Sequence, residues 1–337
     1  MENHDRPLLN ITAPKKGHKR LIGSEHKNLK ERWTDTEFII QNGNLQMQNT
    51  YYTGEAFPML WPNLGPDVFA ALYGTEMIFG ENTAWAVPFL SEKEAEQEPK
   101  FIFNRNGEYY RKLIEMTQAI TEDAKDKYIA GITDLHPGAD GLVSMRGPEN
   151  LCYDTIDRPE FIQKGTLELF KGFKEICDEL YAITTKYQRG SANWSGIWHP
   201  GKWYVTSCDF CCMISEDMFE DLVAPELELE LGYLEANIYH MDGPGAIKHL
   251  DRLLKMEKLQ GIQWVPGAGQ PSASYWLPML KKIQDSGRMI QVNVELGELE
   301  TMLRNLRPEG VFYNLSCRDA EEAEEVLKFA EKMRYEG

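Results

Sequence analysis

The sequence has no apolar run that approaches the roughly 18 residues needed for a membrane-spanning helix. It also has no secretory signal, because its first residues, MENHDRPLLN, are polar and lack an apolar core. These absences predict a soluble protein of the cytoplasm. Its six cysteines are therefore expected as thiols, core residues or metal ligands rather than as disulfides.

Positive charge is also scarce, since 36 Lys and Arg stand against 53 Asp and Glu, for a formal net charge of −17. Nucleic acids are bound through clustered cations, so this balance argues against a nucleic-acid partner. One basic stretch remains near the N-terminus, and it is predicted to belong to a solvated polar extension over residues 1–30. Its cations are Lys15, Lys16, Lys19, Arg20, Lys27 and Lys30.

Along the rest of the chain, short apolar or β-branched runs alternate with longer amphipathic stretches. This alternation predicts a parallel sheet with helical crossovers. Ser215 and Asp319 each precede acidic residues and are predicted to cap helices. The expected fold is α/β, a single (β/α)8 TIM barrel over residues 31–337 with an N-terminal helical extension. The expected strands are 50–57, 128–135, 191–198, 203–206, 237–240, 261–265, 289–294 and 310–315.

Polar and aromatic residues stand where the expected strands end, and in such a barrel these positions face the active site. Carboxylate and imidazole groups exchange protons, so Asp209, Glu295 and His136 are the candidate catalytic residues. The other residues at strand ends are predicted to contact a small-molecule substrate. They are Glu55, Asp134, Trp198, His199 and Trp264.

The combination of His240, Asp242 and Cys317 suggests a metal site. Imidazole, carboxylate and thiolate are all zinc ligands, and three protein ligands leave zinc one open position for a substrate. Two ligands at positions i and i+2 after a strand can turn towards one ion. The alternative is that His240 and Asp242 only form hydrogen bonds, and that Cys317 is a small apolar residue.

Two further motifs are interpreted more simply. Cys208, Cys211 and Cys212 have no second C-x-x-C to complete a cage of four sulfurs, and are expected as loop or buried thiols. The run DLHPG at 134–138 lacks the last glycine of a D-x-H-x-x-G corrinoid-binding signature, because Ala139 stands there. A corrinoid is therefore not expected to bind at His136.

The stretch 239–271, YHMDGPGAIKHLDRLLKMEKLQGIQWVPGAGQP, resembles the uroporphyrinogen decarboxylase superfamily. Residues 55–66, 208–227 and 314–327 follow the same pattern. The superfamily contains cofactor-free decarboxylases and zinc-dependent methyltransferases that act with a corrinoid protein. In the decarboxylases an N-terminal arginine-rich segment binds the substrate, whereas Arg32 is the only arginine in the corresponding residues 31–57. The methyltransferase branch is therefore the closer resemblance.

The resemblance implies a zinc motif H-x-C followed far downstream by a cysteine. His240 and Cys317 match its ends, and Asp242 replaces the middle cysteine. A carboxylate ligand makes zinc a harder Lewis acid, better suited to an oxygen than to a thiol. Asp209 or Glu295 would complete the shell or supply a proton.

The function implied is a methyltransferase that demethylates a small methoxylated compound, with zinc bound and with the corrinoid carried by a partner protein. A decarboxylase or lyase of a small carboxylated substrate is the alternative enzyme, and a barrel-based ligand-binding protein is the alternative without catalysis. A homodimer is compatible with the sequence but is not specified by it.

Overall fold

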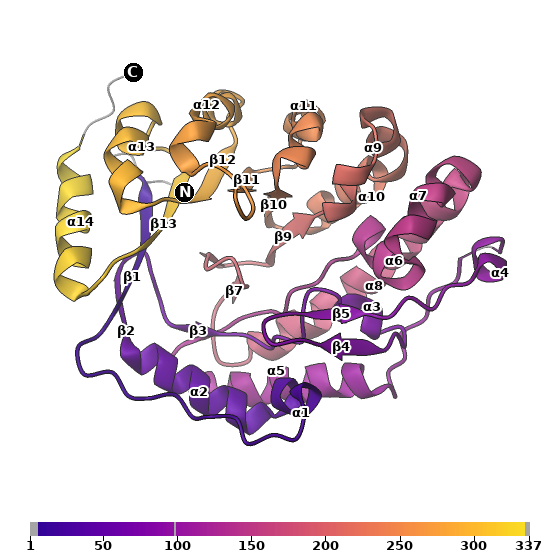
Figure 1. The fold of residues 1–337 in the computed structure, drawn as a ribbon, viewed down its shortest axis with the longest axis horizontal. Coiled ribbons are helices and arrows are strands. Elements are labelled where there is room, and N and C mark those ends of the chain that lie inside the picture. Colours follow the sequence, from indigo (N-terminus) through magenta and orange to yellow (C-terminus); the bar gives the residue numbers. More distant parts are fainter. Residues whose placement is uncertain (1–5, 98, 334–337) are drawn as a thin grey trace. The chain divides into compact units, whose positions relative to one another are not determined.

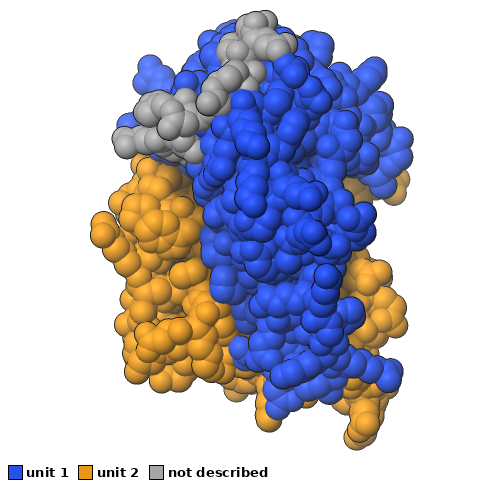
Figure 2. Space-filling view, turned by 90° about the vertical axis from the view of Figure 1, so that its left-hand side faces the viewer, with its two compact units in different colours: residues 1–22, 41–59, 237–337 blue, residues 23–40, 60–236 orange. Residues whose placement is uncertain are grey.

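The computed structural model describes residues 6–97 and 99–333. The chain forms two units, coloured separately in Figure 2. Unit 1 comprises residues 1–22, 41–59 and 237–337, and unit 2 comprises residues 23–40 and 60–236. No helix among the described residues is long and apolar enough to cross a membrane.

Unit 1 is built on a mostly parallel sheet in the order β2-β1-β13-β12-β11-β10 (Figure 1). Only β2 runs antiparallel to its neighbour β1. Each strand from β10 to β13 is followed by a helix, as the alternation in the sequence predicts. The strands are β1 (Leu8–Pro14), β2 (Thr50–Gly54), β10 (Ala236–Asp242), β11 (Gly261–Val265), β12 (Met289–Asn293) and β13 (Val311–Ser316).

Alternate side chains of these strands point to opposite faces. Met241, Trp264 and Val292 pair in register and are almost completely buried. The residues before and after them are mostly polar and form the other face. Unit 1 also contains most of α2 (Thr36–Asn49), and helices α11 (Leu250–Lys255), α12 (Leu277–Asp285), α13 (Leu299–Asn305) and α14 (Ala320–Lys332), with 3-10 turns at Pro244–His249, Ala273–Trp276 and Leu296–Glu298.

Unit 2 is mainly helical, with α8 (Pro159–Thr184) packed against α5, α6, α7 and α10. Its other helices are α1 (Leu29–Thr34), α3 (Val68–Ala71), α4 (Glu92–Ala95), α5 (Glu108–Ala124), α6 (Gly138–Arg146), α7 (Pro148–Asp157), α9 (Glu216–Leu222) and α10 (Ala224–Tyr233), with a 3-10 turn at Asp209–Met213. Its strands are β4 (Met77–Phe79), β5 (Ala84–Ala86), β6 (Ile129–Ala130), β7 (Ser191–Ala192), β8 (Trp198–His199) and β9 (Trp203–Ser207), and β3 (Met59–Leu60) lies at the junction with unit 1.

Both predicted helix caps are confirmed. The Ser215 side chain accepts a hydrogen bond from the Met218 amide at the start of α9. The Asp319 side chain accepts hydrogen bonds from the amides of Glu321 and Glu322 at the start of α14. Each cap satisfies backbone donors that have no partner within the helix.

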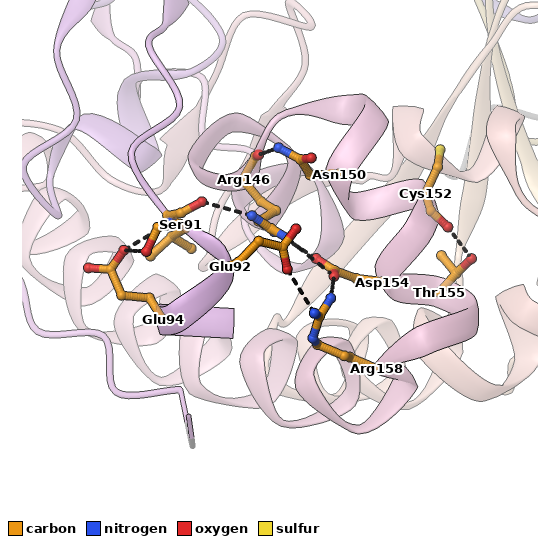
Figure 3. A network of polar contacts seen from close by, with 10 residues as sticks. Ser91, Glu92, Glu94, Arg146, Asn150, Cys152, Asp154, Thr155 and Arg158 are labelled. Atoms are coloured by element: carbon orange, nitrogen blue, oxygen red, sulfur yellow. Dashed lines mark hydrogen bonds and ion pairs between the residues drawn. The ribbon is translucent and has the colours of Figure 1, made fainter. Parts of the chain in front are cut away.

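A buried ion network joins three helices of unit 2 (Figure 3). Asp154 on α7 is 0% exposed and accepts hydrogen bonds from Arg146 Nε at 2.7 Å and Arg158 Nη1 at 2.8 Å. Glu92 on α4 bridges the same two arginines from the surface, at 2.8 Å and 2.7 Å. Because two cations face the buried carboxylate, its charge is compensated.

The N-terminal segment differs from the prediction. Residues 8–14 form β1, in which Leu9 and Ile11 are fully buried, and β1 lies between β2 and β13. The predicted loosely packed extension is therefore wrong for these residues, whereas residues 15–28 are almost entirely exposed. Residues 1–5 of the predicted extension lie outside the described residues.

The barrel prediction is confirmed only as a mixed α/β fold with a largely parallel sheet. No strand pairing among the described residues closes a ring of eight strands. The predicted strand 50–57 runs antiparallel. Residues 128–135 contain only the two-residue strand β6, and residues 191–198 contain β7 and the first residue of β8. Local alternation does not specify pairing direction, which depends on the path of the chain between strands.

Candidate functional site

A ladder of polar side chains crosses the face of the unit 1 sheet opposite Met241, Trp264 and Val292. His240 on β10, Gln263 on β11 and Gln291 on β12 are in register. His240 Nδ1 lies 2.5 Å from Gln263 Oε1, and Gln263 Nε2 donates to Gln291 Oε1 at 2.9 Å. Since the amide oxygen can only accept, Nδ1 carries a proton, and in the neutral ring Nε2 keeps a lone pair. The ladder therefore fixes both the tautomer and the orientation of the ring.

A second ladder lies two residues further along the strands. Asn314 on β13 accepts from Asn10 on β1 and donates to Asn293 on β12, both at 2.9 Å. These amides line a cavity of about 1080 Å³, a volume suited to a small ligand. The loop 265–273 and the candidate catalytic residue Glu295 complete its wall. The cavity offers fixed donors and acceptors at the carboxyl ends of parallel strands.

Two of the three predicted metal ligands lie together. A ring nitrogen of His240 and a carboxylate oxygen of Asp242 are within 4.8 Å of each other. A histidine whose second nitrogen donates to a neighbouring oxygen is typical of metal ligands, because that bond orients the ring. These two residues therefore suit a divalent ion such as zinc.

Cys317 is placed differently. Among the described residues, the groups of metal-binding side chains within 4.8 Å do not include it. Its amide donates to the Thr12 carbonyl at 2.8 Å, and it lines a separate cavity of about 580 Å³. Burial and the charges of Glu322 and Asp319 raise the pKa of Cys317 to about 11, so the thiol is protonated at neutral pH. Of the three predicted zinc ligands, Cys317 is thus the one that does not lie in a metal-binding group with His240 and Asp242.

The cavity beside Cys317 also contains the basic stretch predicted to be a solvated extension. His18, Lys19 and Arg20 line it, and no acidic residue does. The side chain of Asn49 on α2 holds the backbone of Lys19 through two hydrogen bonds, at 2.8 Å and 2.7 Å. These cations are exposed to solvent but held on a fixed backbone.

A second cluster, wholly within unit 2, surrounds His136. His136 Nε2 lies 3.1 Å from Asp134 Oδ1, while Nδ1 lies 2.9 Å from Ser207 Oγ and 3.5 Å from Asp140 Oδ2. Tyr204 holds the backbone just before His136 in place. Its hydroxyl donates to the Thr133 carbonyl and accepts from the Leu135 amide, both at 2.6 Å. The predicted catalytic residue His136 therefore has an acid on either side of its ring.

The charge of this cluster follows from those contacts. Burial lowers the pKa of His136, but the carboxylates of Asp134 and Asp140 outweigh it and hold the pKa well above its usual value. Asp140 also accepts the amides of Asp209 and Phe210, at 2.9 Å and 3.0 Å. His136, Asp140 and Asp209 each place one atom within 4.8 Å of the others, and the carboxylates of Asp134 and Asp140 favour the protonated imidazole. The cluster is an ion-pair centre.

Several of the predicted substrate-binding residues have a structural role. Glu55 accepts two hydrogen bonds from Arg6 and one from the Leu9 amide, at the amino end of β1, away from the cavity at its carboxyl end. Trp264 is 0% exposed and packs on Trp276, on the face opposite the ladders. Both were assigned from position along the chain, whereas strand direction and side-chain alternation decide where they point.

Trp198 and His199 also belong to the framework of unit 2. They form β8, which pairs with β7. The indole nitrogen of Trp198 donates to the Arg189 carbonyl at 2.9 Å, and His199 Nδ1 accepts from the Gly201 amide at 3.0 Å. These bonds stabilise a turn, and contact of Trp198 and His199 with a substrate stays a prediction.

The amide side chains of both ladders were not predicted as site residues. The sequence does contain a signal for them, because Gln263, Gln291 and Asn293 interrupt apolar strands at alternate positions. Two polar residues in a buried strand are unusual unless they are paired or face a ligand. Their alignment depends on strand register, which the sequence does not specify.

No family model matches the chain, and no curated protein matches it in sequence. Among solved structures, the chain is similar to a methyltransferase from Methanosarcina mazei, with 11% sequence identity and a TM-score of 0.63. The match covers 97% of this chain and 93% of that one. At this identity the similarity establishes a shared fold over nearly the whole length.

Proposed function

We propose that this chain is a zinc-dependent methyltransferase that moves a methyl group between a small methoxylated substrate and a separate corrinoid protein. The observation that carries the proposal is the ring of His240, which Gln263 and Gln291 orient so that Nε2 can ligate a metal. The fold shared with a methyltransferase supports the same class of reaction.

Zinc would be held by His240, Asp242 and Cys317, with Glu295 as a further carboxylate. A zinc ion in such a site supplies a Lewis acid for an ether oxygen. His240 and Asp242 fit this role by their proximity. Cys317 would complete the set as a thiolate, which requires it to approach the other two ligands and to lose its proton.

The chain's own residues position the substrate. Asn10, Asn293 and Asn314 line the cavity and offer amides to its polar groups. In demethylation the bond between methyl carbon and oxygen breaks, the methyl group passes to the corrinoid, and the oxygen keeps the electron pair and takes up a proton. Glu295 lines the same cavity and is proposed to exchange that proton.

The test is the metal content of the purified protein, measured with methyl transfer to free reduced cobalamin from methoxylated aromatic acids. Wild type is expected to hold one zinc per chain, and His240→Ala, Asp242→Ala and Cys317→Ala to lose both zinc and activity. Cys152→Ala, in a cysteine of unit 2, is the matched control and should keep both. Zinc retained in Cys317→Ala would remove that residue from the ligand set, and active metal-free protein would overturn the proposal.

A second candidate, a decarboxylase or lyase of a small carboxylated substrate, is favoured by one observation. The cavity beside Cys317 is lined by His18, Lys19 and Arg20 in a chain whose net charge is −17. Cations in a cavity attract carboxylates. Activity that survives metal removal but is lost in a Lys19→Ala/Arg20→Ala variant would favour this candidate over methyl transfer.

A further inference from the structure

Two glutamates of unit 2 are buried side by side on α10. Glu226 and Glu230 are four residues apart, on one face of the helix, and are 4% and 2% exposed. Each carboxyl group acts on the pKa of the other. Two buried carboxylates this close repel each other, so ionisation of one favours the protonated form of the other.

Among the described residues, no cation is paired with Glu226 or Glu230 to compensate a second negative charge. In that part of the chain, neither carboxyl forms an ion pair or a hydrogen bond with a lysine or arginine, and Glu226 Oε1 and Glu230 Oε2 are buried without a hydrogen-bond partner. A buried, unpaired carboxylate is costly, and the group takes up a proton instead. The pair therefore holds at least one proton near neutral pH.

The pair borders the loop that carries His136. A Cβ added to Gly138, the first residue of α6, would lie 2.4 Å from Glu226 Oε2, so the carboxyl group packs directly on that backbone. Gly138 stands between His136 and Asp140 in the chain, and the charge of Asp140 acts on both glutamates. The proton of the pair is thus stored directly behind the imidazole cluster.

We propose that Glu226 and Glu230 form a buried proton store whose charge sets the protonation of His136. As the pH rises, the pair releases its proton to solvent and goes from one negative charge to two. The added charge lies behind the loop that carries His136 and stabilises the protonated imidazole ring. The effect is electrostatic, and it does not depend on the proposed zinc ligands.

The ionisable groups facing the pair support this direction. They are Asp140 from α6, Cys177 from α8 and Tyr204 from β9, all buried. Burial raises the pKa of Glu226 to about 7, with the charge of Asp140 adding to it, and burial and the charge of Glu226 hold the pKa of Glu230 well above its usual value. The pair therefore releases its proton near physiological pH.

The test compares wild type with Glu226→Gln, Glu230→Gln, the double variant, and Glu228→Gln. Glu228 lies on the same helix but is exposed, and is the matched control. Infrared spectra near neutral pH are expected to show a protonated carboxyl band in wild type and in Glu228→Gln that the double variant lacks. Potentiometric titration should show about one fewer proton released by the double variant between about pH 5 and pH 9.

The link to His136 is tested by NMR of its ring nitrogens, assigned with His136→Asn. Removing the negative charge of the pair should lower the pH at which the His136 ring deprotonates in the double variant and leave it unchanged in Glu228→Gln. If the double variant fails to fold, Glu230→Gln alone carries the comparison. Fully ionised glutamates in wild type, an unchanged His136 titration, or Mn²⁺ bound by wild type and lost in the double variant would each overturn the proposal. A lack of methyl transfer would leave these readouts intact.

Discussion

Two buried acidic sites of unit 2 have opposite surroundings. Asp154 is 0% exposed and lies between Arg146 and Arg158, whereas Glu226 is 4% exposed and faces Glu230 and Asp140. The first site is electrically balanced and the second is not. Burial alone therefore does not define the state of a carboxyl group, because the sign of the neighbouring charge decides whether it is ionised.

The comparison separates a structural site from a functional one. A balanced network such as Arg146–Asp154–Arg158 keeps its charges over a wide pH range and holds helices in place. An unbalanced pair such as Glu226–Glu230 must gain or lose a proton when its surroundings change. Perturbed carboxyl groups of this kind cluster at functional sites, which is why the second site carries the proposal.

The largest change in stability is expected when Asp154 is removed from the balanced ion network. Asp154→Asn leaves Arg146 buried without its main partner, which should lower the free energy of unfolding by about 3–5 kcal/mol. Urea unfolding of wild type and variant measures the difference. Glu92→Gln, at the exposed edge of the same network, is the control, with an expected loss below about 1 kcal/mol. A loss from Asp154→Asn no larger than that of the control would contradict the role given to the network.

At the unbalanced Glu226–Glu230 pair, a substitution is expected to raise stability, by a smaller amount. Because the folded-state pKa of Glu226 is raised to about 7, its contribution to stability is present below its usual pKa and is lost as pH rises through about 7. Glu226→Gln removes this loss, so the variant should be more stable than wild type at alkaline pH, by on the order of 1–3 kcal/mol. Thermal unfolding between about pH 5 and pH 9 measures the two curves. Parallel curves would show that the glutamate is ionised in the folded protein throughout.

The neutral ladder of unit 1 extends the comparison to a buried network without charge. Gln263→Leu removes the oxygen that accepts from His240 Nδ1 and frees the ring to rotate. Zinc affinity is expected to fall by about 10–100-fold, the usual effect of losing a residue that orients a ligand. Competition with a chromogenic chelator measures this, and Asn314→Leu, in the other ladder, is the control that should leave zinc affinity unchanged.

The smallest change is expected for a control variant, which gives the baseline for the three predictions above. Glu228→Gln changes an exposed acid on the helix that carries the buried pair, and should alter the free energy of unfolding by less than about 0.5 kcal/mol at any pH. Urea unfolding at acid and alkaline pH checks this. A pH-dependent difference would show that the helix as a whole responds to charge, and would weaken the assignment to Glu226 and Glu230.

Much of the back half of the fold was predictable from local pattern. Residues 261–265 were predicted as a strand and form β11 with the same limits, and β10, β12 and β13 follow the predicted order. Residues 8–14 were missed because Asn10 and Thr12 interrupt the apolar pattern. The paired strand neighbours on both sides of β1 are distant in the chain, and no local signal reports them.

The sequence by itself determined the alternation of strands and helices, the helix caps at Ser215 and Asp319, and which residue types were available for metal or proton chemistry. Only the tertiary structure decided which of these meet. Register joined His240 to Gln263 and Gln291, strand direction placed Glu55 at the far end of β1, and helix packing brought Glu226 against Gly138. The physical reason is that periodicity is a property of neighbours along the chain, whereas ionisation and ligand binding depend on neighbours in space.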